Sequence, residues 1–195
     1  MTTTAEYLEI LRAGRGTAVV VTTMTAARLW PQGGDSPLDI NYLPSAMGHA
    51  ADLALGIALA QPQRSVVCVN GDGSLAMNLG GLITAVAQRA ANFVHLLIVN
   101  HSYHIVGGPP IPAAGRVDWA GLARAAGWLQ AWTCASSAEF AAILPAALAP
   151  SGPHFIALEV TDPPAPLGQL PPRHPAQALR DLRSSWPTLP PPPRA

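Results

Sequence analysis

The feature that most constrains the fold of this chain is a series of short, nearly continuous apolar runs. Runs of strand length occur at TAVVVTT (17–23), SVVCV (65–69), FVHLLIV (93–99) and FIALEV (155–160). A strand that reads as a continuous apolar run is buried on both faces, which is typical of a parallel sheet covered by helices on each side. The sequence therefore predicts a sheet of mostly parallel strands.

Helical stretches separate these runs. We expect helices at 4–13, 47–60, 77–91, 117–126 and 137–149, and one further strand at 128–134. Such alternation predicts an α/β fold of three layers, α/β/α, in which a mostly parallel sheet is wound right-handed between the helices. A chain of 195 residues is long enough for one stable domain, which we place at residues 1–162.

The composition changes after residue 162. Eleven of the 21 prolines lie in 163–195, and a run of prolines near the end cannot donate hydrogen bonds to a sheet. We therefore expect a Pro-rich C-terminal tail at 163–195 with one short helix near 175–185. Two alternatives stay open for this tail, since it either wraps a partner or is disordered.

The charge content excludes several classes of protein. The formal net charge is zero and no basic cluster occurs, so we expect no nucleic-acid partner. The apolar runs are shorter than the roughly 20 residues that span a bilayer, and the N-terminus does not resemble a signal peptide. We therefore expect a cytoplasmic protein with no membrane segment, in which Cys68 and Cys134 are buried thiols rather than a disulfide. With only 11% charged residues, a face buried against another chain is also expected.

The stretch NGDGS (70–74) directly follows the second apolar run and carries the clearest chemical signal. Glycines at a strand end allow the backbone to approach a phosphate closely, and the start of a helix favours an anion. Asp72 would repel a bare phosphate, but a Mg²⁺ ion between them resolves the conflict. A simple tight turn is the alternative. Asn100 argues against it, because it lies at the end of the next strand and supplies a second oxygen ligand at the same sheet edge.

With these residues in place, the chain resembles a known family. GDGSLAMNLGGLITAV, NFVHLLIVNHSYHIVGG and the upstream LPSAMGHAADLALGIALA resemble the metal–diphosphate region of thiamine diphosphate (ThDP) enzymes. The resemblance is strongest to the pyrophosphate-binding half of phosphonopyruvate and sulfopyruvate decarboxylases, and it covers about residues 16–160. It implies a ThDP-binding fold with ThDP and Mg²⁺ as cofactors.

The resemblance also implies which residues hold these cofactors. The Mg²⁺ ligands would be the side chains of Asp72 and Asn100 and the main-chain carbonyl of Ser102. The diphosphate would be held by Gly71, Gly73 and Ser74.

Four further positions complete the implied site. Met47 matches the bulky apolar residue that bends the cofactor, although it could simply fill the core, and Tyr103 borders the cofactor. His101 and His104 are candidates for contacting an anionic substrate; a zinc site formed by the two is the alternative, without support from a further Cys or His cluster. Among the departures from the family pattern, His101 replaces the usual Gly and Val99 the usual Asp or Asn.

One residue that the chemistry needs is missing. In relatives a glutamate on the cofactor's pyrimidine comes from a separate pyrimidine-binding domain, for which this chain has no room. The resemblance therefore implies that an alpha-like partner subunit supplies the glutamate. A hetero-oligomer follows, such as a heterotetramer or a larger complex.

These expectations favour one function and leave others open. The favoured reading is the ThDP- and Mg²⁺-binding subunit of a heteromeric 2-oxo acid decarboxylase, a carbon–carbon lyase that is active only with its partner. The alternatives are a subunit of a ThDP-dependent carboligase in specialised metabolism, of the acyloin- or acetolactate-synthase type, and a non-catalytic regulatory subunit. A 2-oxo acid:ferredoxin oxidoreductase is disfavoured, because two distant cysteines cannot hold an iron–sulfur cluster.

Overall fold

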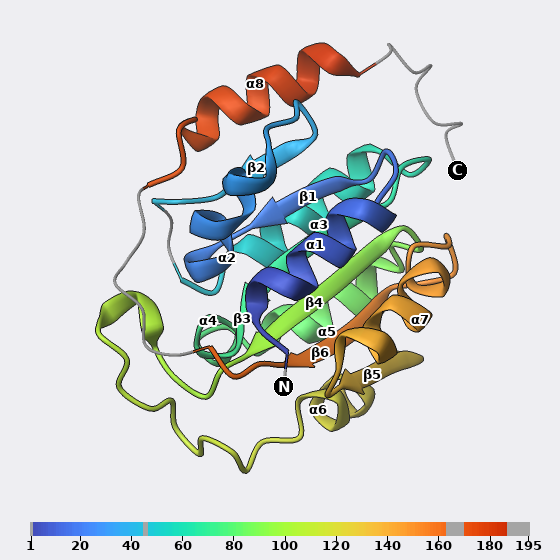
Figure 1. Cartoon of the computed structure of the whole chain (residues 1–195). Coiled ribbons are helices and arrows are strands. Elements are labelled where there is room, and N and C mark those ends of the chain that lie inside the picture. Colours follow the sequence, from blue (N-terminus) through green and yellow to red (C-terminus); the bar gives the residue numbers. More distant parts are fainter. Residues whose placement is uncertain (1, 45–46, 163–169, 187–195) are drawn as a thin grey trace.

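A six-stranded, all-parallel sheet forms the centre of the computed structural model, which describes residues 2–44, 47–162 and 170–186 (Figure 1). The strand order is β2-β1-β3-β4-β6-β5. The strands are β1 (Val19–Thr22), β2 (Asp39–Asn41), β3 (Val66–Gly71), β4 (Phe93–Val99), β5 (Gln130–Cys134) and β6 (His154–Glu159). This arrangement confirms the predicted α/β fold with a parallel sheet.

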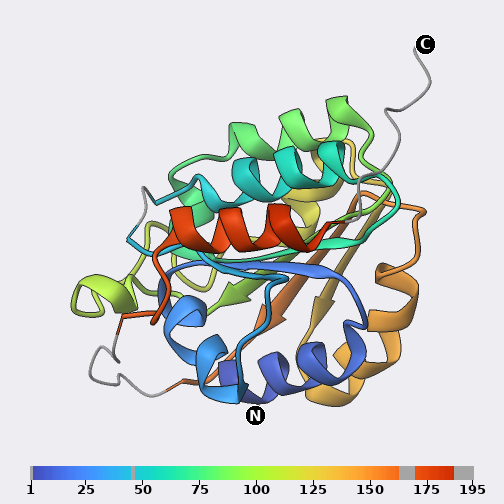
Figure 2. The same ribbon diagram turned by 90° about the horizontal axis from the view of Figure 1, so that it is seen from above.

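Helices cover both faces of this sheet (Figure 2). One face carries α3 (Ala50–Ala60), α5 (Gly80–Gln88), α6 (Trp119–Ala125) and α8 (Pro175–Ser185). The other face carries α1 (Thr4–Gly14), α2 (Met24–Leu29) and α7 (Ser137–Ala147). Along β3, Val66 and Cys68 pack toward the first set of helices and Val67 toward the second. Because both faces of a strand are buried, its sequence reads as one apolar run.

The ends of the expected elements differ from the structure in a few places. The stretch expected as a helix at 47–60 is helical from Ala50, and residues 72–88 form two helices, α4 (Asp72–Ala76) and α5. Strand β2 lies in a stretch where no strand was expected. One short 3₁₀ turn, η1 (Trp30–Gly33), follows α2, and another, η2 (His104–Val106), lies within the long loop after β4. Both cysteines are buried and free, as expected.

Helix α8 packs against the edge strand β2 and contributes Ala178 and Leu182 to the core. This helix lies where one was expected in the C-terminal tail; the parts of the tail at 163–169 and 187–195 lie outside the described residues. Within the described residues, no helix is long and apolar enough to cross a membrane.

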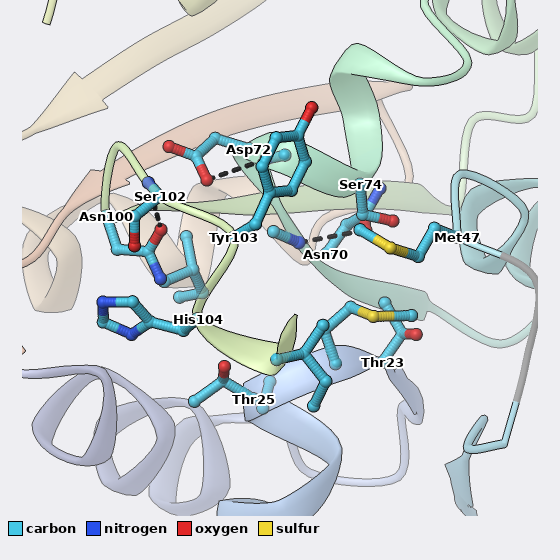
Figure 3. A pocket seen from close by; sticks show the side chains of 16 residues that line it. Thr23, Thr25, Met47, Asn70, Asp72, Ser74, Asn100, Ser102, Tyr103 and His104 are labelled. Carbon is cyan, nitrogen blue, oxygen red and sulfur yellow. Dashed lines mark hydrogen bonds between the residues drawn. The ribbon is translucent and has the colours of Figure 1, made fainter. Parts of the chain in front are cut away.

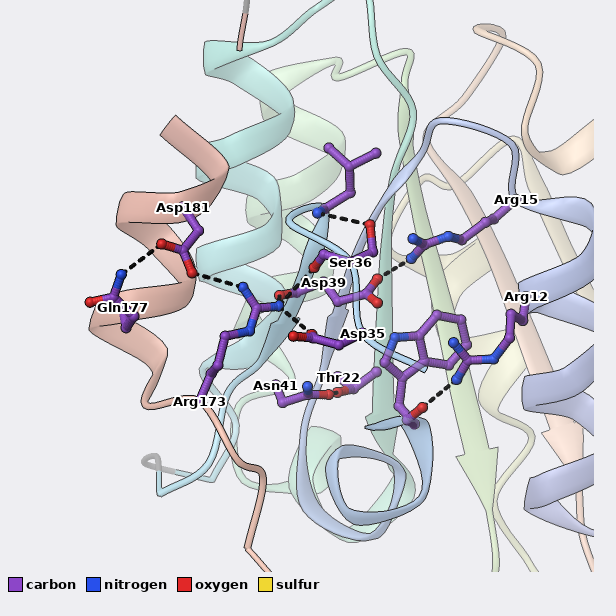
Figure 4. A network of polar contacts seen from close by, with 12 residues as sticks. Arg12, Arg15, Thr22, Asp35, Ser36, Asp39, Asn41, Arg173, Gln177 and Asp181 are labelled. Carbon is purple, nitrogen blue, oxygen red and sulfur yellow. Dashed lines mark hydrogen bonds and ion pairs between the residues drawn. The ribbon is translucent and has the colours of Figure 1, made fainter. Parts of the chain in front are cut away.

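A polar network anchors α8 to the turn before β2 (Figure 4). Arg173 donates to the carboxylates of Asp35 at 2.6 Å and Asp181 at 3.0 Å. It also donates to the main-chain oxygens of Ser36 and Asp39 at 2.7 and 3.1 Å. On the other side of β2, the Asp39 carboxylate pairs with Arg15. The start of β2 is therefore tied both to the end of α1 and to the segment that leads into α8.

His95 lies in the middle of β4 among aromatic rings, with its centroid 5.3 Å from that of Phe155 and 6.3 Å from that of Trp128. Its Nε2 has no hydrogen-bond partner in the described part of the chain, and burial lowers the pKa of His95 to about 4. The folded protein therefore holds a neutral imidazole, whereas the unfolded chain takes up a proton below its ordinary pKa of about 6.5.

We expect this difference to make the fold acid-sensitive. Since the unfolded state binds the extra proton, the free energy of unfolding should fall by about 3 kcal/mol as the pH drops from 6.5 to 4. Urea unfolding across this range should show the slope, and His95→Phe should flatten it. An equal slope in both proteins would contradict the assignment.

Candidate functional site

A pocket lies where β1, β3 and β4 end, at the carboxyl edge of the sheet (Figure 3). It brings together all the residues singled out from the sequence except His101, namely Met47, Gly71, Asp72, Gly73, Ser74, Asn100, Ser102, Tyr103 and His104. The parallel pairing of Gly71 with Ile98 explains this meeting, because it places the turn after β3 beside the loop after β4.

Asp72 joins these two segments. Its carboxylate is buried and accepts the main-chain N–H of Gly73 at 2.8 Å and that of His101 at 2.7 Å. Burial raises the pKa of the Asp72 carboxyl, and these two N–H groups offset only part of the rise. The ionised form of Asp72 would therefore be favoured by a cation beside it.

Asn100 and Ser102 occupy the loop that leaves β4. The side-chain oxygen of Asn100 accepts the N–H of Ser102 at 3.0 Å, which holds both residues at the strand end. The chain then passes through Tyr103 and η2 and returns, so that Ser102 pairs with Pro110 in an antiparallel bridge. This loop carries Tyr103 and His104 to the pocket.

Met47 is held near the turn after β3 by its neighbour Gly48. The Gly48 N–H donates to the hydroxyl oxygen of Ser74 at 2.9 Å, and its carbonyl accepts the Asn78 side chain at 3.0 Å. Gly48 has a φ of +92°, and a Cβ there would lie 2.9 Å from the Cβ of Asn78. Only glycine meets both requirements without strain. Because the Ser74 oxygen is the acceptor, its own proton remains available to a ligand.

The structure adds pocket residues that the sequence reasoning missed. Asn70 precedes the GDG turn, and Thr23, Met24 and Thr25 follow β1. Met24 is almost fully buried and adopts a φ of +52°, a backbone conformation that residues other than Gly rarely take. The topology contained a signal for the residues after β1. All parallel strands end at the same edge of the sheet, so these residues must lie at the same edge as those that follow β3 and β4.

Three observations fit a bound diphosphate and divalent cation. The buried carboxylate of Asp72 has a raised pKa. The side-chain nitrogen of Asn70 and the hydroxyl of Ser102 are buried and have no hydrogen-bond partner among the described residues. A Cβ at Gly71 would meet nothing within 4 Å, which leaves open space beside the turn. Buried polar groups of this kind usually have partners, and here a ligand would supply them.

The described residues give no support to a zinc site. Nowhere in 2–44, 47–162 or 170–186 do three or more His, Cys, Asp or Glu side chains gather as metal ligands would. His104 lines the pocket, whereas the ring of His101 lies 3.3 Å from the Glu159 carboxylate at the end of β6. An oxygen-rich set suits Mg²⁺ better than zinc.

Comparison with known proteins gives an independent result. Residues 18–158 match the family of thiamine pyrophosphate enzymes at their C-terminal TPP binding domain, thiamine pyrophosphate being another name for ThDP. The matched range runs from the residue before β1 almost to the end of β6 and includes the pocket.

Two curated relatives share part of this sequence. Phosphonopyruvate decarboxylase of Streptomyces hygroscopicus is 40% identical over 119 residues, which are 61% of this chain and 29% of that protein. Sulfopyruvate decarboxylase subunit beta of Methanothermobacter thermautotrophicus is 47% identical over 73 residues, which are 37% of this chain and 38% of that subunit. The chain thus matches less than half the length of either relative.

A solved structure shares the fold. Benzoylformate decarboxylase from Polynucleobacter necessarius superposes with a TM-score of 0.72 at 20% identity, and the match covers 84% of this chain and 34% of that one. At this identity the likeness supports the fold alone.

The contact between Gly73 and Tyr103 gives a first test of the site's geometry. A Cβ at position 73 would lie 2.6 Å from two ring carbons of Tyr103, so Gly73→Ala should destabilise the chain by about 1–3 kcal/mol through overpacking. In a Tyr103→Ala background the same change should cost much less. Chemical denaturation of the four proteins in this cycle measures the difference.

Gly71→Ala is the matched control, because its Cβ meets no atom within 4 Å. It should leave the stability of the ligand-free chain nearly unchanged. Equal losses for Gly73→Ala in both backgrounds would rule out the proposed contact.

Proposed function

This chain belongs to the family of thiamine pyrophosphate enzyme C-terminal TPP binding domains, and from this we propose that it is the ThDP- and Mg²⁺-binding subunit of a heteromeric 2-oxo acid decarboxylase. The observation that carries the proposal is the meeting of Asp72, Asn100 and Ser102 at the ends of two adjacent parallel strands. The named activities of its relatives, on phosphonopyruvate and sulfopyruvate, point to a small anionic 2-oxo acid as substrate.

In this proposal the turn after β3 and the loop after β4 hold the metal together. The Asp72 carboxylate, the Asn100 side-chain oxygen and the Ser102 carbonyl are the Mg²⁺ ligands, and Mg²⁺ is the usual metal of the family. Gly71 and Gly73 leave room for the diphosphate, and the free hydroxyl proton of Ser74 donates to it. Asn70, with its unpaired side-chain N–H groups, is a further donor.

The other pocket residues position the reacting end of the site. Met47 would support the cofactor, and its place is fixed through the Gly48–Ser74 hydrogen bond. Tyr103 and His104 close the pocket from the loop after β4, and His104 is the proposed contact for the substrate's acidic group. When bound, ThDP supplies the electron sink that lets a 2-oxo acid lose CO₂.

We further propose that a separate subunit supplies the catalytic glutamate. None of the four glutamates in the described chain lines the pocket. The 73 matched residues are 38% of the Methanothermobacter beta subunit, so that subunit and this chain are of similar length. Its designation as a beta subunit supports a division of the enzyme into two kinds of chain.

The surface formed by α3 and α5 is the proposed contact with that partner. Leu59, Leu79 and Ile83 are exposed by 46%, 43% and 63% on these helices and the turn that precedes α5. Met77, in the turn after α4, is exposed by 55%. Single exposed apolar residues are ordinary, but several large ones on two helices that contact each other are typical of a subunit interface.

Asp72→Asn tests the metal assignment. The variant removes the charge but keeps a side chain of the same shape, so we expect Mg²⁺-dependent ThDP affinity to fall by about 100-fold or more. Isothermal titration of the assembled complex with ThDP, with and without Mg²⁺, measures this.

Asp118→Asn is the control, because Asp118 is exposed and caps α6, a role that asparagine fills equally well. It should bind the cofactor as the unsubstituted protein does. Unchanged affinity in Asp72→Asn would refute the assignment.

Partner dependence is tested by activity and assembly together. The purified chain should release no CO₂ from 2-oxo acids, and turnover should appear after co-expression with its partner subunit. Ile83→Asp should keep the monomer folded but weaken assembly, since it places a charge on the apolar α3–α5 surface.

Ala142→Asp is the matched control, being exposed on α7 on the opposite side of the sheet. It should assemble normally in the same size-exclusion experiment. Turnover by the chain alone would overturn the two-subunit proposal. Acyloin formed from a second carbonyl compound, in place of released aldehyde, would identify a carboligase.

A further inference from the structure

His101 connects three segments of the chain through four polar contacts. Its main-chain N–H donates to Asp72 at 2.7 Å, and its carbonyl accepts the N–H of Ile111 at 3.1 Å. On the side chain, Nδ1 accepts the N–H of Gly115 at 3.2 Å, and Nε2 lies 3.3 Å from a carboxylate oxygen of Glu159. The residue thus touches the turn after β3, the returning loop and the end of β6.

The ring contacts fix the tautomer. Nδ1 must be unprotonated to accept the Gly115 N–H, so the neutral ring carries its proton on Nε2, directed toward Glu159. Glu159 sits at the end of β6, where it pairs in register with Val99 of β4. The imidazole therefore bridges the returning loop to the sheet.

The loop that His101 holds also forms one wall of the pocket. Tyr103 and Ile111, on its outgoing and returning arms, both contact Gly73, with ring and methyl carbons 2.6 and 3.1 Å from a Cβ built there. The two arms are joined by the Tyr103 N–H to Pro109 carbonyl bond at 2.8 Å. Displacement of the returning arm would therefore move the residues that lie against the diphosphate turn.

Histidine is an unfavourable residue for this backbone position. His101 has a φ of +59°, in the left-handed region where glycine is strongly preferred. A glycine here would make the same main-chain bonds to Asp72 and Ile111 without conformational cost. Only the side-chain bridge to Gly115 and Glu159 distinguishes the histidine.

We propose that His101 is a positioning residue. Its ring links the returning arm at 111–117 to the end of β6, a link that we call the clasp, and so keeps Tyr103 and His104 in place at the pocket. The role rests on the proposed function, since the pocket is taken to bind ThDP. It assigns no substrate contact to His101 and leaves that role to His104.

His101→Gly is the main test. The full chain should melt at the same temperature or higher, because the left-handed backbone is relieved. Amide hydrogen exchange at 111–117 should rise by about tenfold as the arm opens locally. In the complex with its partner, ThDP affinity should fall by about tenfold through loss of positioning.

Changes at Glu159 test the same bridge without altering the left-handed residue. Glu159→Gln keeps an oxygen that can accept from Nε2 and should behave as the unsubstituted chain does. Glu159→Ala should reproduce part of the rise in exchange. A purely structural role would lower the melting temperature in His101→Gly and leave the ThDP affinity of the folded complex unchanged.

The proposal is overturned if His101→Gly leaves both the exchange at 111–117 and the ThDP affinity unchanged. Hydrogen exchange is measured without cofactor, so it tests the bridge formed by His101 even if the unsubstituted complex binds no ThDP. A failure of the unsubstituted complex to bind ThDP would refute the proposed function alone. If exchange rises while affinity holds, the clasp exists but does not position the site, and the proposal fails.

Discussion

The buried carboxylate of Asp72 is the interaction on which the site depends. It accepts one N–H from its own turn, at Gly73, and another from the neighbouring loop, at His101. Two backbone segments are thereby locked at a fixed separation, although they belong to different strand–helix units. A carboxylate has further lone pairs beyond these two bonds, and they remain for a ligand. Burial opposes its charge, so the same group that orders the two segments favours a cation there.

The core strands and the meeting of Asp72 and Asn100 at the site could be predicted from the sequence for a physical reason. Strands covered on both faces must be apolar throughout, so β3, β4 and β6 were recognisable as runs without alternation. Adjacent parallel strands end together, so the sequence alone places Asp72 and Asn100 at one edge of the sheet. The covering helices were located well, but α3, α5 and α6 begin later than expected, since the start of a helix depends on local capping contacts.

Other parts depended on contacts between distant residues and could not be predicted. Strand β2 has three residues, and two of them are polar. They are buried only because Arg15 pairs with Asp39 and Thr22 donates to Asn41 at 2.7 Å. The relevance of Asn70 likewise appears only when its side chain is found buried beside the pocket without a partner. No periodicity in the sequence reports such a relation.

The docking of α8 has a consequence for how the protein is made. Strand β2 is an edge of the sheet, and an uncovered edge invites pairing with a foreign strand. Its cover, anchored by Arg173, is synthesised well after β2, because β2 ends at Asn41 and α8 begins at Pro175. At a synthesis rate of about 5–20 residues per second, the edge of β2 stays uncovered for on the order of ten to thirty seconds. The nascent chain is therefore exposed to aggregation through this edge during the interval between the synthesis of β2 and that of α8.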